Sequence, residues 1–291
     1  MESAQQALPD LPVPFQAPPR SRAKVVFYDG EGRQIERSTR QLFGRALETW
    51  EYAGLAGAPD DAVVEVGTLQ GGIYLELWEP ASNAYRGSHV AQRLSLGVVL
   101  FNEGFHIQRK CLQRQGLGLG VVARQVHWAK ALGVLRIIAM AGRRHQENGY
   151  YTWPRYGFDG PLPAEVRRRL PPGLHYARTV LDLIQCESGR QWWRQHGTPL
   201  YVSFDLADGS RSWAVFQHYL RQAGRTAESR ELRVESPERR ACGTAALGCV
   251  LCATASQKPC PRAKTASTAS AKQWHTDVVL AGAFASGRPC C

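Results

Sequence analysis

The sequence contains no apolar run long enough to cross a membrane. A spanning helix needs about 20 consecutive apolar residues, and polar or charged residues interrupt every apolar stretch well before that length. Residues 1–19 also lack the apolar segment of a secretory signal and are rich in proline and alanine. The sequence therefore predicts a cytoplasmic protein with no membrane association.

Metal-site and nucleic-acid signatures are missing as well. Cys249 and Cys252 have C-x-x-C spacing, but no second matching pair accompanies them, so we expect no metal ion. The net charge of +11 indicates an anionic partner. The arginines are spread along the chain, however, and no helix-turn-helix, zinc-finger or RNA-binding signature occurs. Nucleic acid is therefore possible but not favoured, and the phosphates of a coenzyme are the other candidate.

Two glycines, Gly116 and Gly118, form the most informative motif. They lie in residues 113–118 (Gln-Arg-Gln-Gly-Leu-Gly), where backbone N–H groups at a helix N-terminus would favour an anion. A dinucleotide fingerprint needs a third glycine where Val121 stands, and the Gly-Lys-Ser or Gly-Lys-Thr of a P-loop does not occur. The remaining interpretations are the pattern Gln/Arg-x-x-Gly-x-Gly/Ala and a simple flexible turn.

A strand, a helix and a second strand are predicted around this motif. Residues 105–112 can form the first strand, and residues 119–132 have apolar side chains spaced by three or four, as in a helix. Gly133 is a suitable helix stop. Residues 134–141 are apolar and include β-branched side chains, which is typical of a buried strand.

This order of elements, together with Gln113, Gly116 and Gly118, resembles the GNAT superfamily of N-acetyltransferases. In that family the loop joins a central strand to a helix and cradles the pyrophosphate of coenzyme A. The resemblance implies that these residues bind acetyl-CoA: Leu112, Gln113, Arg114, Gln115, Gly116, Leu117, Gly118, Leu119, Gly120 and, near the pantetheine arm, Asn148.

A second piece of the resemblance lies downstream, where Trp153 stands four residues before Gly157 and Phe158. Family members often carry tyrosine at this aromatic position, and its hydroxyl can protonate the departing thiolate. Trp153 has no hydroxyl, and Pro154 is expected to break or begin a helix. The resemblance leaves the phenol to another tyrosine of the cluster, with these candidates: Tyr150, Tyr151 and Tyr156.

The candidate general bases are Glu103 and His106, which stand at the start of the predicted central strand, where this family often places such a group. Either residue would take a proton from the acceptor amine through a water molecule. For each of these side chains, and for each tyrosine, packing or a surface position is the alternative interpretation.

The fold class predicted for the chain is α/β (α+β). The expected arrangement is a GNAT-like mixed, mostly antiparallel twisted sheet flanked by helices, with a C-terminal α/β extension. Residues 39–52 should form a helix, 62–68 and 73–78 two antiparallel strands, and 94–101 either a strand or a helix. The expected domains are a disordered segment at 1–22, an acyl-CoA-binding domain at 23–160, an extension at 161–226 and a disordered or non-native tail at 227–291.

The function predicted from the sequence is an acyl-CoA-dependent N-acyltransferase that transfers acetyl from acetyl-CoA to an amine-bearing acceptor. Two alternatives stay open: a catalytically inactive GNAT-like binding module and a basic nucleic-acid-binding protein. The acceptor is not predicted, because acceptor loops vary independently of the fold.

Overall fold

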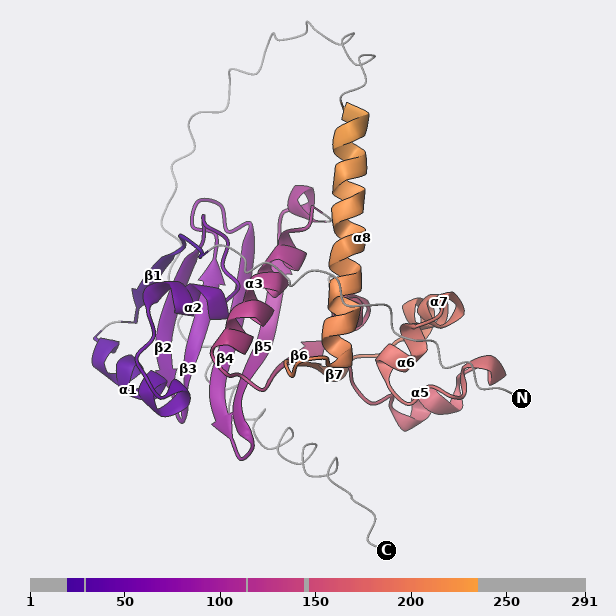
Figure 1. Ribbon diagram of the computed structural model, residues 1–291, viewed down its shortest axis with the longest axis horizontal. Helices are drawn as coiled ribbons and strands as arrows, with labels where there is room; N and C mark the ends of the chain where they lie inside the picture. Colours follow the sequence, from indigo (N-terminus) through magenta and orange to yellow (C-terminus); the bar gives the residue numbers. More distant parts are fainter. Residues whose placement is uncertain (1–19, 29, 114, 144–146, 235–291) are drawn as a thin grey trace, which may run out of the picture. The chain divides into compact units, whose positions relative to one another are not determined.

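The computed structural model describes residues 20–28, 30–113, 115–143 and 147–234 (Figure 1). Within them, seven strands form one sheet whose spatial order is the order of the sequence. The pairs β1/β2 and β5/β6 are parallel, and the other four neighbouring pairs are antiparallel. The strands are β1 (Lys24–Phe27), β2 (Val63–Leu69), β3 (Gly72–Trp78), β4 (Tyr85–Leu94), β5 (Gly97–Ile107), β6 (Arg136–Ala141) and β7 (Leu200–Asp205).

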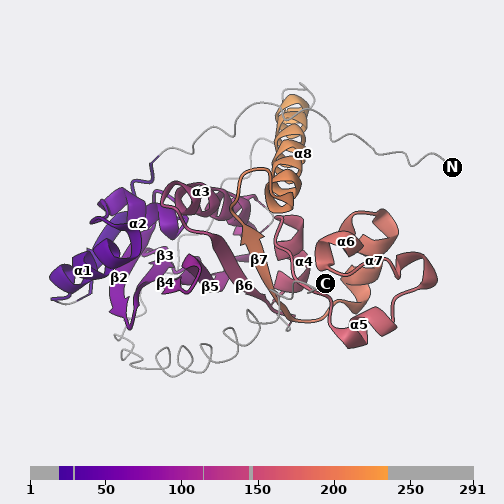
Figure 2. The same cartoon turned by 60° about the horizontal axis from the view of Figure 1, so that its bottom comes forward.

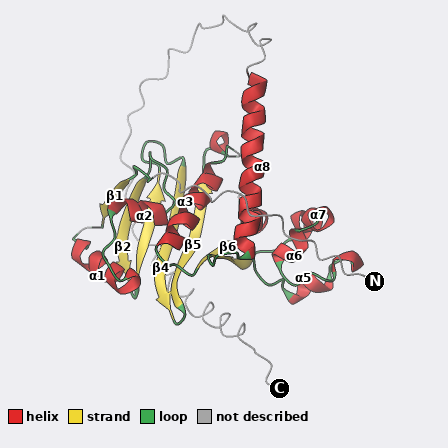
Figure 3. Cartoon of the chain, viewed as in Figure 1, coloured by secondary structure: helices red, strands yellow, loops and turns green. Residues whose placement is uncertain are grey.

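Helices flank this sheet (Figure 3), so the predicted fold class, a mixed α/β architecture with a mostly antiparallel sheet, is confirmed. The helices before β7 are α1 (Gly32–Phe43), α2 (Thr49–Leu55), α3 (Leu117–Ala131), α4 (Gly149–Arg155), α5 (Ala164–Arg168), α6 (Val180–Ile184) and α7 (Glu187–His196), and α8 (Arg211–Val234) follows it.

One face of the sheet is covered by α1, α2 and α3 (Figure 2). Side chains on β3 alternate as a strand requires: Ile73, Leu75 and Leu77 are fully buried, and the residues between them are half-buried. Helices α2 and α3 are so close that a Cβ at Gly54 would lie 2.4 Å from Cδ1 of Trp128. Only glycine fits that crossing.

The prediction of a single helix over residues 39–52 is wrong. The chain instead forms α1 and α2, because Gly44 adopts a left-handed conformation (φ 77°) that ends α1. A capping box between Glu48 and Glu51 then begins α2. Glu51 is buried and forms an ion pair with Arg45, which compensates its charge.

Strand β5 differs from the prediction in its bounds. It begins at Gly97 and ends at Ile107, whereas the sequence placed a strand at residues 105–112 and left 94–101 undecided. Beyond Ile107 the partner strand β4 has ended, and Lys110–Leu112 form a 3-10 helix, η1. The extent of β5 is therefore set by its partner and not by its own composition.

The residues after Phe158 share the core of the sheet. Strand β7 pairs with β6, and Phe204 on β7 packs against Phe158, Trp213 and Phe216 at ring-centroid distances of 5.4–5.7 Å. Helix α8 continues to Val234, past residue 227, where the sequence placed the beginning of a tail. Residues 1–19 and 235–291, which include most of the two predicted disordered ends, lie outside the described residues, and the boundary at residue 160 stays a prediction.

Candidate active site

Strands β5 and β6 pair over only part of their length. The parallel ladder joins residues 99–102 to residues 136–139, and β5 then continues through residues 103–107 beside β4 alone. A register shift opposite Ser88 and His89 leaves Glu103 as an extra residue in β5, which is a β-bulge. Among the described residues, the backbone groups on the β6 side of this last part of β5 have no ladder partner, so they can pair with an extended ligand.

Helix α3 begins directly after the glycine motif. Gly116 is the N-cap residue, with φ 86°, and no side chain caps the helix. The first N–H to bond within the helix is that of Gly120, which donates to the Gly116 carbonyl at 2.9 Å. The preceding N–H groups, on Leu117, Gly118 and Leu119, have no intrahelical acceptor, and the helix dipole makes this end electropositive. The geometry therefore suits an anion.

The turn from β5 into α3 is held by its glutamine side chains. The Gln113 amide donates to the Ile107 carbonyl at 2.9 Å, and the Gln115 amide donates to the Cys111 carbonyl. These two side chains hold the loop through bonds to its own backbone. Leu112, Leu117 and Leu119 pack half-buried against the core, and Arg114 lies outside the described residues.

The two motif glycines serve different purposes. Gly116 needs its left-handed backbone, and a Cβ there would meet open space. At Gly118 a Cβ would lie 3.9 Å from Tyr156 Oη, 3.9 Å from Phe105 Cε1 and 4.0 Å from Ile107 Cδ1. Gly118 therefore marks the place where α3, the unpaired end of β5 and the end of α4 meet.

Among the three candidate tyrosines, Tyr156 is the one at this junction. It follows α4 as the C-cap residue, and its ring packs on that of Tyr219 at 5.2 Å. Burial raises the pKa of the Tyr156 hydroxyl to about 12, so the phenol is neutral and can donate a hydrogen bond at physiological pH. Tyr150 instead donates to the Arg194 carbonyl, and the ring of Tyr151 lies near the guanidinium groups of Arg155 and Arg194.

Pro154 neither breaks nor begins α4, contrary to the sequence expectation. It lies buried inside the helix and cannot donate to the Tyr150 carbonyl four residues earlier. The indole N–H of Trp193 donates to that carbonyl at 2.8 Å and replaces the missing bond. Trp153 packs on Phe158 at 4.7 Å and so belongs to the core.

The predicted bases occupy the β5 bulge and its end. Glu103 accepts a hydrogen bond from the Ser88 hydroxyl at 2.9 Å. His106 is exposed, and its Nε2 lies 3.1 Å from where a Cβ on Gly104 would be. Asn148 is the exposed N-cap residue of α4; its carbonyl accepts the N–H groups of the first turn, and its side chain does not cap the helix.

Sequence reasoning missed a buried polar chain beside this junction. His89 Nδ1 contacts Asn102 Oδ1 at 2.9 Å, Asn102 donates to Gln125 Oε1 at 2.7 Å, and Gln125 donates to the Leu55 carbonyl at 3.0 Å. Because Nδ1 faces an acceptor, we assign the His89 proton to Nδ1. Complete burial lowers the pKa of His89 to about 4. The chain ties β4, β5, α3 and α2 together at Asn102, the last β5 residue that pairs with β6.

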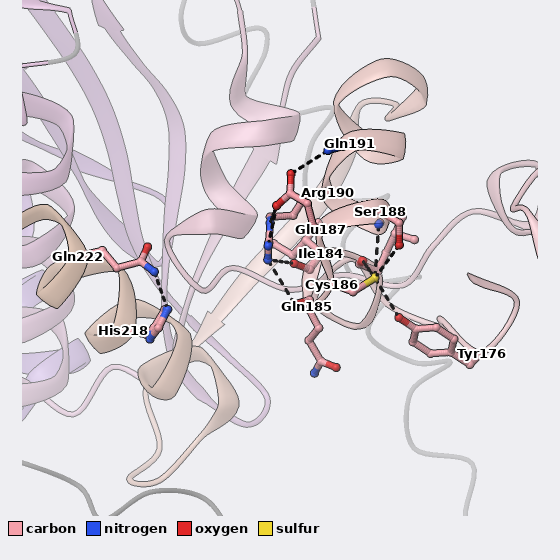
Figure 4. A network of polar contacts seen from close by, with 12 residues as sticks. Tyr176, Ile184, Gln185, Cys186, Glu187, Ser188, Arg190, Gln191, His218 and Gln222 are labelled. Atoms are coloured by element: carbon pink, nitrogen blue, oxygen red, sulfur yellow. Dashed lines mark hydrogen bonds and ion pairs between the residues drawn. The ribbon is translucent and has the colours of Figure 1, made fainter. Parts of the chain in front are cut away.

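A second polar network surrounds Cys186, which is the N-cap residue of α7 (Figure 4). Its Sγ accepts the Gly189 N–H at 3.4 Å and contacts the Ser188 and Tyr176 hydroxyls at 3.3 and 3.5 Å. The hydrogen bonds with Ser188 and then Tyr176 lower the pKa of this thiol to about 7. This network shares no residue with the junction at Gly118.

The described residues contain neither a metal-binding cluster nor a membrane-spanning helix. No group of three or more His, Cys, Asp or Glu side chains is arranged to hold a metal ion in that part of the chain. No helix within the same residues is both long enough and apolar enough to cross a membrane.

The chain has only a distant structural similarity to a known protein among those compared. No protein-family model and no curated protein matches the chain. Among solved structures, the chain is similar to the loading GNATL domain of CurA from Lyngbya majuscula, with 18% sequence identity and a TM-score of 0.25. The match covers 47% of this chain and 77% of that domain.

Proposed function

We propose that the protein is an acyl-CoA-dependent N-acyltransferase that transfers acetyl from acetyl-CoA to an amine. The observation that carries the proposal is the junction at Gly118. There, an uncapped helix N-terminus, an unpaired strand end and a neutral phenol meet within about van der Waals distance. Each of the three supplies a group that acyl transfer from a phosphate-bearing thioester needs.

Binding would use the backbone. The N–H groups of Leu117, Gly118 and Leu119 would hold the pyrophosphate, because they are the helix's free donors. The pantetheine amides would pair with residues 103–107 of β5, which lack a partner strand on that side. A β5 N–H would also polarise the thioester carbonyl, as an oxyanion hole does.

In the reaction, the neutral amine attacks the thioester carbon, a C–N bond forms and the C–S bond breaks. A base, Glu103 or His106 acting through water, takes the amine proton. Tyr156 faces the departing sulfur. Its pKa of about 12 lies above the roughly 8.5 of a thiol, so we expect the phenol to stabilise the thiolate by a hydrogen bond, with full proton transfer left to solvent. Holding the two substrates side by side supplies much of the rate.

The test is release of free coenzyme A thiol from acetyl-CoA in the presence of pooled amines, corrected for the thiols of the protein. Gly118→Asp places a negative charge beside the proposed pyrophosphate, whereas Gly118→Asn has nearly the same size without the charge. Both residues fit the helical backbone there, and aspartate suits the first turn of a helix. We expect thiol release by the wild type, a strong loss in the Asp variant and a smaller loss in the Asn variant.

Equal thiol release by all three proteins would place the reaction elsewhere in the molecule. Acetyl-CoA binding without turnover for any amine would favour the binding-module alternative. Trp153 supports that alternative, because it packs in the core at the position where the family carries tyrosine.

A further inference from the structure

Arg155 and Arg194 come from two different helices, and both guanidinium groups lie near the ring of Tyr151. The guanidinium carbon of Arg155, one turn along α4, lies 5.3 Å from the ring centroid, and that of Arg194 on α7 lies 6.0 Å away. The Tyr150 hydroxyl, which donates to the Arg194 carbonyl at 2.9 Å, fixes α7 against α4. Two cations thus share one aromatic ring in a defined arrangement.

Neither cation is neutralised by a described side chain. No ion pair among the described residues includes Arg155 or Arg194. Arg190, one turn earlier on α7, differs: it pairs with Glu187 at 2.7 Å and donates to the carbonyls of Ile184 and Gln185 (Figure 4).

Arg143, which stacks on Tyr150, also differs, because its guanidinium donates to the carbonyls of Gly197 and Gln195. Arg155 uses one donor, to the Tyr219 hydroxyl at 3.2 Å, and so retains most of its five N–H groups. The N–H groups of an arginine stacked on a ring project from its edge, where they match the oxygens of a carboxylate or a phosphate.

The pair is linked to the candidate reaction centre through Tyr219. This ring contacts the Tyr156 ring at 5.2 Å, and its hydroxyl accepts the Arg155 hydrogen bond. Tyr156 in turn lies at Gly118, where α3 begins. Arg155 therefore stands one aromatic side chain away from the phenol that would face the departing sulfur, and Arg194 lies near the same Tyr151 ring as Arg155.

We propose that Arg155 and Arg194 select an acceptor amine that carries an anionic group, a carboxylate or a phosphate. This inference rests on the proposed acyl-transfer function and assigns its substrate class. The acceptor's anion would bind the free N–H groups at the edges of the two guanidinium groups beside Tyr151, and its amine would extend toward Tyr156. Bound there, the anion relieves the mutual repulsion of the two cations as well as forming charge-assisted hydrogen bonds.

The experiment compares acetyl transfer to matched amines with and without the anion. One pair is β-alanine and its amide, and the other is O-phosphoethanolamine and ethanolamine. For each pair the measurement is the ratio of kcat/KM for the charged amine to that for the neutral amine. Because the intrinsic reactivities of the amines cancel when variants are compared with the wild type, the change in the ratio reports the arginines. The pair with the larger change identifies the anion as carboxylate or phosphate.

We expect Arg155→Gln and Arg194→Gln each to lower this ratio roughly ten- to a hundredfold, as loss of hydrogen bonds to a charged group does. Arg190→Gln is the matched control, since its guanidinium is already neutralised by Glu187, and the ratio should stay at the wild-type value. If both arginine variants show the same kcat/KM ratio as the wild type, the inference about the acceptor is wrong, and the acyl-transfer proposal is unaffected.

A binding measurement separates this inference from the function on which it rests. Isothermal titration of each charged amine without coenzyme should give binding that the Arg155 and Arg194 variants lose. If that binding occurs but acetyl-CoA neither binds nor turns over, the acyl-transfer proposal fails and the anion site stands. If the arginine variants weaken acetyl-CoA instead of the charged amine, the pair serves a coenzyme phosphate and the acceptor inference is wrong.

Discussion

The buried histidine at the divergence of β5 and β6 should make the protein acid-sensitive in a calculable way. Burial lowers the pKa of His89 from 6.5 to about 4 in the folded protein, so protons bind the unfolded chain more readily. The contribution of neutral His89 to stability is fully present above pH 6.5 and is lost as the pH falls toward 4. At about 1.4 kcal/mol per pKa unit, linkage gives a loss of about 1 kcal/mol at pH 5.5 and about 3 kcal/mol at pH 4.

The assay is urea unfolding at pH 7, 5.5 and 4 for the wild type and for His89→Gln, whose amide can still donate to Asn102. Carboxylates titrate equally in both proteins, so the difference between the two unfolding free energies isolates His89. We expect the variant to be less stable at pH 7 and the difference to shrink by about 3 kcal/mol by pH 4. Parallel pH dependences would refute the assignment of a buried neutral imidazole.

Three further outcomes follow from single contacts. Tyr156→Phe should lower kcat at least tenfold, the size of a lost transition-state hydrogen bond, with the acetyl-CoA Kd unchanged in isothermal titration. Equal losses in kcat and affinity would contradict its role at the sulfur. Trp193→Phe leaves the Tyr150 carbonyl unpaired beside Pro154, so thermal or urea unfolding should show a loss of about 1–3 kcal/mol. Cys186, with a pKa of about 7, should be alkylated by iodoacetamide at pH 7 at about half its limiting rate at high pH. Ser188→Ala should slow that reaction, measured by peptide mass spectrometry, and an unchanged rate would show that the Ser188 hydrogen bond does not set the pKa.

The features of the site that depend on local conformation could be predicted from the sequence. A left-handed N-cap favours glycine wherever it occurs, so Gly116 and the beginning of α3 could be read from neighbouring residues. The bounds of β5 could not, because they depend on where β4 stops. The break at Gly44 was missed because the apolar spacing continues across it, which made two helices look like one.

The features that could not be predicted from the sequence depend on contacts between distant elements. The three tyrosines in and after α4 cannot be distinguished by sequence, and only the packing of α8 and α3 brings Tyr156 to Gly118. The polar chain runs from His89 through Asn102 to Gln125, and no short motif encodes contacts between residues so far apart in the sequence. The pair formed by Arg155 and Arg194 likewise exists only because α7 packs on α4.

The most direct test of the central claim is titration of acetyl-CoA into the wild type, Gly118→Asp and Gly118→Asn by calorimetry at low salt. A unit charge about 4 Å from a phosphate costs at least about 1 kcal/mol even at the dielectric constant of water. We therefore expect the wild type to bind acetyl-CoA, and the aspartate variant to bind it at least about fivefold more weakly than the asparagine variant. Identical affinities for the three proteins, or no binding by the wild type, would contradict this claim.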